Sequence, residues 1–273
     1  MHTSSRSPFY QLRQAVAAAT VAITLVAAPA VAQEQPLRVG VTAGPHAQIG
    51  EVVKQLAEKH GLQVKLIEFS DFIQPNAALD AGDLDINIYQ HRPFLESQNS
   101  ARGYKLTPVA NAVVQQMGIY SKRHKSLADL PDGARIAIPN DPTNGARALL
   151  VLQAAKLIEL KPGITVTASL FDIAENPKKL KFVEIEAAQL PHSLADVDAA
   201  AVNSAYAIPA GLSPTKDSLA LETQDAEFAV VVIAAREDNK ADPRIARFVK
   251  AYQSEETKQF VEKTFPGAYT TAW

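Results

Sequence analysis

Short apolar segments of this chain alternate between two periodicities, and that alternation constrains the fold more than any other feature. Residues 37–41, 64–69 and 84–89 show the spacing of β-strands, whereas residues 49–57 and 76–81 between them have helical spacing. Strands that alternate with helices in this order predict a mostly parallel sheet with helices on its faces. This part of the chain is therefore expected to form an α/β unit.

A second series of strands and helices follows. Residues 92–105 are interpreted as a loop and residues 109–120 as extended, and the polar, turn-rich residues 121–133 are expected to cross between two lobes. The later predicted elements are strands at 135–138, 165–168, 182–185, 199–202, 219–221 and 228–235, a helix that runs to Leu160, a short helix between Leu190 and Val197, and two closing amphipathic helices.

Two successive α/β units, with a tail that can return to the first, predict two lobes around a ligand cleft. The expected division places residues 33–117 and 224–273 in lobe 1 and residues 118–223 in lobe 2. Ligands of open α/β sheets bind beyond the carboxyl ends of the strands, so the loops at those ends are the first place to look for a site.

The first 32 residues have the pattern of an export signal. Arg6 and Arg13 are the only charged residues in this segment, residues 15–28 are almost entirely apolar, and small residues end it at Ala32. A membrane span needs about 20 apolar residues, so cleavage after Ala32 is favoured over an anchor left in place. The chain contains no cysteine. We therefore expect a periplasmic protein that is exported through a cleavable signal peptide and is not lipid-anchored through cysteine.

Composition excludes several classes of function. The 273 residues are 47% hydrophobic and 21% charged, which is typical of a globular chain with a core. A formal net charge of −2 gives no electrostatic case for binding nucleic acid. The usual motifs for phosphate loops, dinucleotides and serine hydrolases are absent, and the histidines have no metal-ligand spacing. These absences remove the usual routes to hydrolysis and nucleotide chemistry but do not by themselves exclude an enzyme. The leading expectation is a protein with no metal, no cofactor and no enzymatic reaction.

The stretch from Ile136 to Arg147 has the form of a strand that leads into an anion-binding helix. Pro139 ends the strand, and Asp141-Pro142 combines an N-cap acceptor with proline at the first helical position. Arg147 then falls in about the second turn, from which its side chain can reach back to the helix N-terminus and hold a carboxylate. The alternative is a surface arginine on a solvated helix face.

Aromatic and amide residues follow other strands. Tyr89 and His91, with Phe72 after the preceding strand, can form an aromatic wall or can simply cap the core. Because their loop, the loop at 140–144 and the loop at Asn203 all follow strands, we expect these residues to converge on one site.

Several stretches together resemble the NlpA family, the methionine-binding components of bacterial ABC importers. The resemblance covers nearly the whole mature chain. Its most specific stretches are residues 71–76, 89–94, 127–133, 136–147, 182–191 and 210–214. It implies a periplasmic-binding-protein fold, in which two α/β lobes joined by crossover segments close on a free amino acid.

The resemblance also implies roles for single residues. Arg147 would grip the ligand carboxylate, and Asn203 would hold the polar groups of the ligand backbone. Phe72, Tyr89 and His91 would surround the ligand side chain. The implied ligand is methionine, and the implied partners are an ABC permease and its ATPase, with the binding protein itself a monomer.

Two departures from the family pattern leave alternatives open. Val231 stands where the family usually has asparagine, so the ligand can instead be another apolar amino acid or a short peptide. Members are commonly lipoproteins, and this chain has no cysteine to carry a lipid. A secreted enzyme that uses Asp and His in the cleft is the alternative from a different class.

Overall fold

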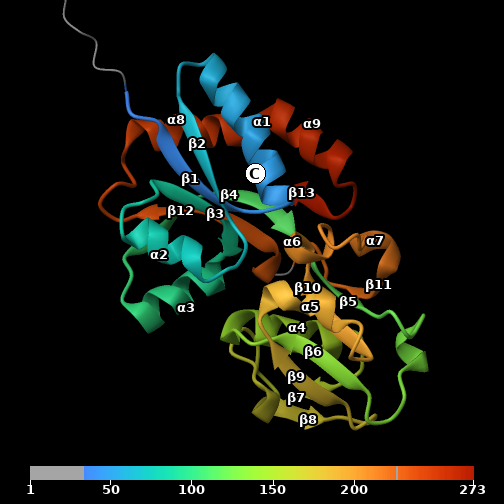
Figure 1. Cartoon of the computed structure of the whole chain (residues 1–273). Helices are drawn as coiled ribbons and strands as arrows, with labels where there is room; N and C mark the ends of the chain where they lie inside the picture. Colours follow the sequence, from blue (N-terminus) through green and yellow to red (C-terminus); the bar gives the residue numbers. More distant parts are fainter. Residues whose placement is uncertain (1–33, 226) are drawn as a thin grey trace, which may run out of the picture. The chain divides into compact units, whose positions relative to one another are not determined.

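The structure, a computed structural model, describes residues 34–225 and 227–273. Residues 35–273 form one compact unit (Figure 1). The predicted export signal lies outside the described residues. No helix in the described part of the chain has the length and apolar character that crossing a bilayer requires. The unit contains two principal sheets, each with its own helices, which define lobe 1 and lobe 2.

Lobe 1 is built on a six-stranded sheet with the order β13-β4-β12-β3-β1-β2. β1 pairs in parallel with β2 and β3, but β12 lies antiparallel to both β3 and β4, so the sheet is mixed rather than mostly parallel. Its elements are β1 (Leu37–Thr42), α1 (Pro45–Lys59), β2 (Val64–Phe69), α2 (Gln74–Asp80), β3 (Ile86–His91), α3 (Arg92–Arg102), β4 (Leu106–Gln115), β12 (Val230–Arg236), α8 (Pro243–Tyr252), α9 (Glu255–Thr264) and β13 (Tyr269–Thr271).

Lobe 2 is built on a five-stranded sheet with the order β11-β5-β10-β6-β9. β6 is parallel to β9 and β10, whereas β5 is antiparallel to β10 and β11. Its elements are β5 (Met117–Tyr120), η1 (Leu127–Asp129), β6 (Arg135–Pro139), α4 (Pro142–Ala154), β7 (Glu159–Leu160), η2 (Leu170–Asp172), β8 (Ile173–Glu175), β9 (Lys181–Ile185), η3 (Ala187–Gln189), α5 (Leu190–Ser193), β10 (Ala199–Asn203), α6 (Ser204–Ala207), α7 (Pro214–Asp217) and β11 (Ser218–Leu221), and the short η4 (Glu227–Ala229) precedes β12.

β12 shows how the sheet of lobe 1 is buried on both faces. Val231, Ile233 and Ala235 join the core that α1, α8 and α9 complete, and Figure 1 shows these three helices together. Val232 and Ala234 join a separate cluster with residues of α2 and α3. A central strand covered on both faces cannot expose polar side chains, which accounts for the unbroken apolar run in its sequence.

The chain passes between the two sheets twice, and neither passage lies in the polar segment 121–133 that the sequence suggested as a crossing. One passage is the short turn from Gln115 to Met117, and the other runs from Glu222 to η4. β5 already belongs to lobe 2, so residues 121–133 lie within that lobe and the predicted crossing there is wrong. Polar, turn-rich composition indicates exposure, not a change of lobe. The residue boundaries of the two lobes stay a prediction.

The segment predicted as a loop at 92–105 contains helix α3, whose N-cap residue is unusual. The ring Nδ1 of His91 caps the helix by accepting a hydrogen bond from the backbone N–H of Phe94 at 3.1 Å. Pro93 occupies the first turn, and Gly103 ends the helix in the left-handed region with φ of 74°. Histidine is not among the residues usually expected at an N-cap, so the pattern was missed.

Two predictions after Arg147 are also wrong. Helix α4 ends at Ala154, not Leu160, because the chain turns away at Lys156, where φ is 60°. Residues 165–168 form no strand; they lie in turns and irregular backbone. Apolar residues such as Ile164 and Ala168 pack onto the core of lobe 2 without joining a sheet.

Candidate functional site

The N-terminus of α4 is organised by one aspartate. Asp141 caps the helix, accepting hydrogen bonds from the Asn144 backbone N–H at 2.9 Å and from Thr143 Oγ1 at 3.0 Å. It also accepts from the side-chain Nδ2 of Asn144, at 3.1 and 3.0 Å from its two oxygens. Burial raises the pKa of the Asp141 carboxyl, which these hydrogen bonds partly offset. The amide of Asn144 is thereby fixed with its Oδ1 directed away from Asp141.

Asn144 Oδ1 is the meeting point of two other strand ends. His91, at the end of β3, lies with its Nε2 at 3.3 Å from this oxygen, and Asn203, at the end of β10, donates to it from Nδ2 at 3.0 Å. The three loops expected to converge therefore do so. The Oδ1 of Asn203 is buried and has no hydrogen-bond partner among the described residues. It is an acceptor that remains available to a ligand.

The hydrogen bonds of His91 define its protonation. Its Nδ1 accepts from the backbone of Phe94, so the proton of the neutral ring belongs on Nε2, which donates to Asn144. Burial, reinforced by the charge of Arg147, lowers the pKa of His91 to about 3. His91 is therefore a neutral donor at pH 7, unable to act as a cation toward a ligand.

Aromatic rings close the other side of the site. Phe72 lies 5.7 Å from Tyr89 and 4.7 Å from Tyr206, centroid to centroid, and the Tyr89 hydroxyl donates to the carbonyl oxygen of Phe72 at 3.2 Å. Phe72 and Tyr89 belong to a buried cluster and also face a cavity, so the two interpretations of the aromatic wall are compatible. The residues around that cavity are Phe72, Tyr89, Gln90, His91, Phe94, Gln115, Asn144, Asn203 and Val231.

The side chains leave very little room in this cavity. Its volume is about 10 Å³, which is about the space of one water molecule. The residues come from both lobes, so a ligand as large as an amino acid requires the lobes to separate before it binds.

Arg147 lies beside the cavity but not among the residues that line it. It is buried, with 1% of its surface exposed, and it is paired with Glu222, which lies between β11 and β12. Nε donates to the two Glu222 oxygens at 2.9 and 3.0 Å, and Nη2 donates to Oε2 at 2.5 Å. Nη2 also donates to the carbonyl oxygen of Gln115 at 2.6 Å. Arg147 is thus not a solvated surface arginine, and it already has a carboxylate partner.

Four residues around the cavity were not singled out from the sequence: Gln90, Phe94, Gln115 and Asn144. Asn144 was inside a predicted loop and could have been found as a polar residue three positions after an N-cap. Gln115 had no sequence signal. Its side-chain oxygen lies 2.7 Å from His46 Nε2, and burial lowers the pKa of His46 to about 4. Gln115 therefore connects the cavity to the start of α1.

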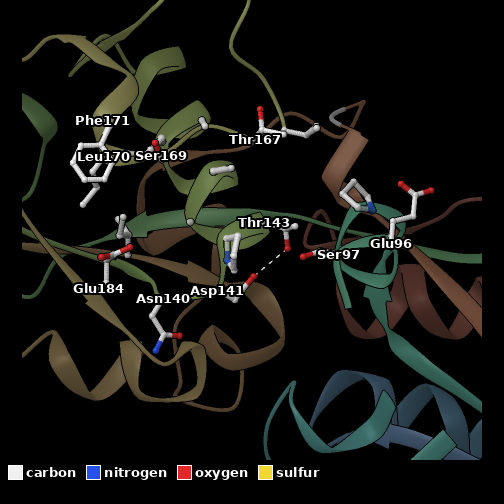
Figure 2. Close-up of a pocket in the computed structure, with 18 residues that line it drawn as sticks. Glu96, Ser97, Asn140, Asp141, Thr143, Thr167, Ser169, Leu170, Phe171 and Glu184 are labelled. Carbon is white, nitrogen blue, oxygen red and sulfur yellow. Dashed lines mark hydrogen bonds between the residues drawn. The ribbon is translucent and has the colours of Figure 1, made fainter. Parts of the chain in front are cut away.

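A larger pocket lies outside this site, with a volume of about 660 Å³. Figure 2 shows Glu96 and Ser97 of α3 on one side and Phe171 and Glu184 of lobe 2 on the other. Phe171 is 89% exposed. Asp141 and Thr143 at the start of α4 also line this pocket, so it is adjacent to the site.

The residues that the structure describes contain no group of His, Cys, Asp or Glu side chains arranged to hold a metal ion. The site consists instead of neutral amides, aromatic rings and one internally paired arginine. This set of groups suits reversible binding of a small polar–apolar molecule.

Two α/β lobes, joined by two crossovers around a closed cavity, define a periplasmic-binding-protein fold. A protein-family model described as "NlpA lipoprotein" matches residues 37–273. The chain belongs to this family.

Relatives and solved structures agree with that membership. The chain is 45% identical over 240 residues to a D-methionine-binding lipoprotein of Yersinia pestis, covering 87% of this chain and 88% of the relative. A nutrient-binding protein from Burkholderia cenocepacia, solved bound to methionine, is 50% identical with a TM-score of 0.84, covering 87% of this chain and all (100%) of that one. An ABC-transporter periplasmic substrate-binding protein from Coxiella burnetii is 48% identical with a TM-score of 0.83, covering 86% and 100%.

The family overturns the predicted localisation. The sequence predicted a periplasmic protein that is not lipid-anchored through cysteine. The matching family model describes a lipoprotein, and the Yersinia pestis relative is named a lipoprotein. The prediction of an unanchored protein is therefore contradicted. It rested on the absence of one residue type, and such an absence does not outweigh membership in a lipoprotein family.

Proposed function

We propose that this protein is the solute-binding component of an ABC importer and that it binds a free amino acid, methionine first, between its lobes. The observation that carries the proposal is the cavity where Asn144, His91 and Asn203 meet against Phe72 and Tyr89. Polar groups on one side and aromatic faces on the other suit a molecule with a charged backbone and an apolar side chain.

Each predicted site residue has a role in this proposal. The free Oδ1 of Asn203 accepts a hydrogen bond from the ligand ammonium. Phe72 and Tyr89 contact the thioether, with about 0.3–1.5 kcal/mol for each sulfur–aromatic contact. His91 donates from Nε2 as a neutral group. Nε of Arg147 donates to Glu222, and Nη2 donates to Glu222 and Gln115. Its Nη1 makes no hydrogen bond to the described residues, and this atom donates to the ligand carboxylate.

The proposed partners are the permease and ATPase of the importer, to which a monomeric binding protein delivers its ligand. Closure of the lobes lets the permease distinguish a loaded binding protein from an empty one, because the closed, loaded form differs in shape from the open form. The protein performs no reaction in this scheme and releases its ligand unchanged.

Isothermal calorimetry on protein that has been unfolded and refolded tests the ligand. We expect L- or D-methionine to bind more tightly than leucine, norleucine or a methionine dipeptide. If one of those other molecules binds more tightly, the proposed transport role stands and methionine is not the ligand. The comparison is needed because Val231, in the cavity wall, stands where an asparagine was expected. Mass spectrometry of the recovered solute distinguishes a secreted enzyme, which would return a modified molecule.

A further inference from the structure

We infer that Glu222 is a charge-balancing residue: it cancels the charge of Arg147 and makes the site select ligands without net charge over anions. The inference rests on the proposed function, since it assumes that Arg147 faces the ligand carboxylate. It concerns a residue outside the cavity lining, in the second crossover between the lobes.

Glu222 has the geometry of a buried counter-ion to Arg147. The Arg147 and Glu222 side chains are 2% and 7% exposed, and their closest atoms lie 2.5 Å apart. Three hydrogen bonds join Arg147 to the carboxylate, two from Nε and one from Nη2. Charged groups in a buried pair this close are screened little by solvent, so Arg147 presents directional donors to the ligand but little net positive charge.

Backbone contacts hold Glu222 in place, so that it does not leave Arg147 when a ligand binds. Its Oε2 accepts from the Met117 backbone N–H at 3.0 Å, and its own backbone N–H donates to the Met117 carbonyl oxygen at 2.9 Å. Its carbonyl oxygen accepts from the side chain of Gln116. These contacts join Glu222 in the second crossover to residues of the first crossover, so the carboxylate is held in a fixed position beside Arg147.

The other charges near the cavity act in the same direction. His91 is neutral, as its low pKa requires, and Asp141 at the start of α4 adds a carboxylate. An anionic ligand would face an arginine that is already neutralised, with the Asp141 carboxyl directly behind Asn144. A zwitterion can place its carboxylate near Arg147 Nη1 and its ammonium near Asn203, and it adds no net charge to the closed site.

Competition calorimetry with three related ligands tests the inference. The ligands are L-methionine, the anion 4-(methylsulfanyl)butanoate, which lacks the ammonium, and the cation methioninol, which lacks the carboxylate. In Glu222→Gln the side chain keeps its shape and loses its charge. We expect the affinity of the anion relative to methionine to rise at least about tenfold, the effect of roughly 1.4 kcal/mol.

Two further variants separate charge from structure. Glu222→Asp retains the charge, and its anion-to-methionine ratio should stay within about threefold of wild type, equivalent to less than about 0.7 kcal/mol. Glu159→Gln, an exposed carboxylate on β7 of the same lobe, is the matched control and should not alter the ratio. An unchanged ratio in Glu222→Gln, or an equal shift in Glu222→Asp, would overturn the inference.

Wild-type protein provides a test that needs no variant to fold. With Arg147 neutralised, methioninol should bind at least as tightly as the anion, whereas an uncompensated arginine would favour the anion. Tighter binding of the anion would therefore overturn the inference. Failure of the proposed function is a separate outcome, in which refolded wild-type protein binds none of the amino acids tested.

Discussion

At the scale of single residues, the site depends on amides whose orientation is fixed by their neighbours. Asp141 holds the Nδ2 of Asn144, so Asn144 Oδ1 faces His91 and Asn203. Asn203 uses its Nδ2 in that contact and keeps its Oδ1 free. The chain of bonds therefore determines which atom of Asn203 faces a ligand.

Replacing Asn203 tests this assignment. Asn203→Ala should weaken methionine binding by about 1.5–3 kcal/mol, or roughly 10- to 150-fold, because a hydrogen bond to a charged group is lost. Asn111→Ala, an exposed amide on β4, is the control and should bind as wild type does. Calorimetry measures both, and equal affinities in the two variants would show that Asn203 does not contact the ligand.

The buried histidines make stability depend on pH. The folded-state pKa values of His46 and His91 are about 4 and about 3, below the value of about 6.5 expected in the unfolded chain. Between these limits the unfolded state binds more protons, so the free energy of unfolding should rise with pH. Their contribution is complete above about pH 6.5 and is lost as pH falls toward 4 for His46 and toward 3 for His91.

Urea unfolding at several pH values measures that dependence. In His46→Gln, whose amide can still pair with Gln115, the free energy of unfolding should fall less between pH 7 and pH 5 than in wild type. Equal slopes in the two proteins would show that His46 does not titrate as its burial requires.

The sequence indicated these residues only in part. Helical spacing placed Arg147 near the start of α4, and the strand ends marked Tyr89, His91 and Asn203. Glu222 could not be found in this way, because it lies 75 positions from Arg147 and pairing over that distance depends on the fold. The roles of the five predicted residues stay predictions.

At the scale of elements, helix caps position the site as well as stabilising the helices. His91 caps α3 with one ring nitrogen and contacts Asn144 with the other, and Asp141 caps α4. Both helices begin at the cavity. Strand and helix order could be predicted from periodicity, but α3 was missed because its cap is a histidine.

The cap of α4 should serve both stability and binding. Asp141→Ala should lower the free energy of unfolding by about 1–2 kcal/mol and should also weaken methionine binding, because Asn144 loses the partner that orients it. Ser254→Ala removes a cap from α9 in lobe 1, where Ser254 Oγ accepts from the Thr257 backbone N–H. It should lower stability comparably and leave binding unchanged. Weakened binding in both variants would contradict the specific role of Asp141.

At the scale of the whole molecule, the small cavity predicts movement of the lobes. About 10 Å³ cannot hold an amino acid, so the ligand requires a more open form and closure must follow binding. The two-lobe arrangement could be predicted from the two α/β series. The polar composition of residues 121–133 suggested a crossover that the structure does not have, whereas the turn at Gln116 and the segment that begins at Glu222 have no composition that separates them from other loops.

Small-angle scattering measures closure. A compact chain of this length has a radius of gyration of about 18 Å, which we expect for the protein with methionine, and refolded ligand-free protein should be larger. Saturation with methionine should reverse the difference, and a non-binding amino acid is the control. An identical radius in verified ligand-free and saturated samples would contradict lobe closure.

The larger pocket between α3 and lobe 2 makes the protein suited to an optical sensor. Because Ser97 and Phe171 lie on opposite sides of it, a change in lobe separation alters the polarity around any group placed there. The printed sequence contains no cysteine, so Ser97→Cys would be the one thiol available to a maleimide dye. A polarity-sensitive fluorophore at that position would convert the presence of the amino acid into a change in emission, without a transport assay.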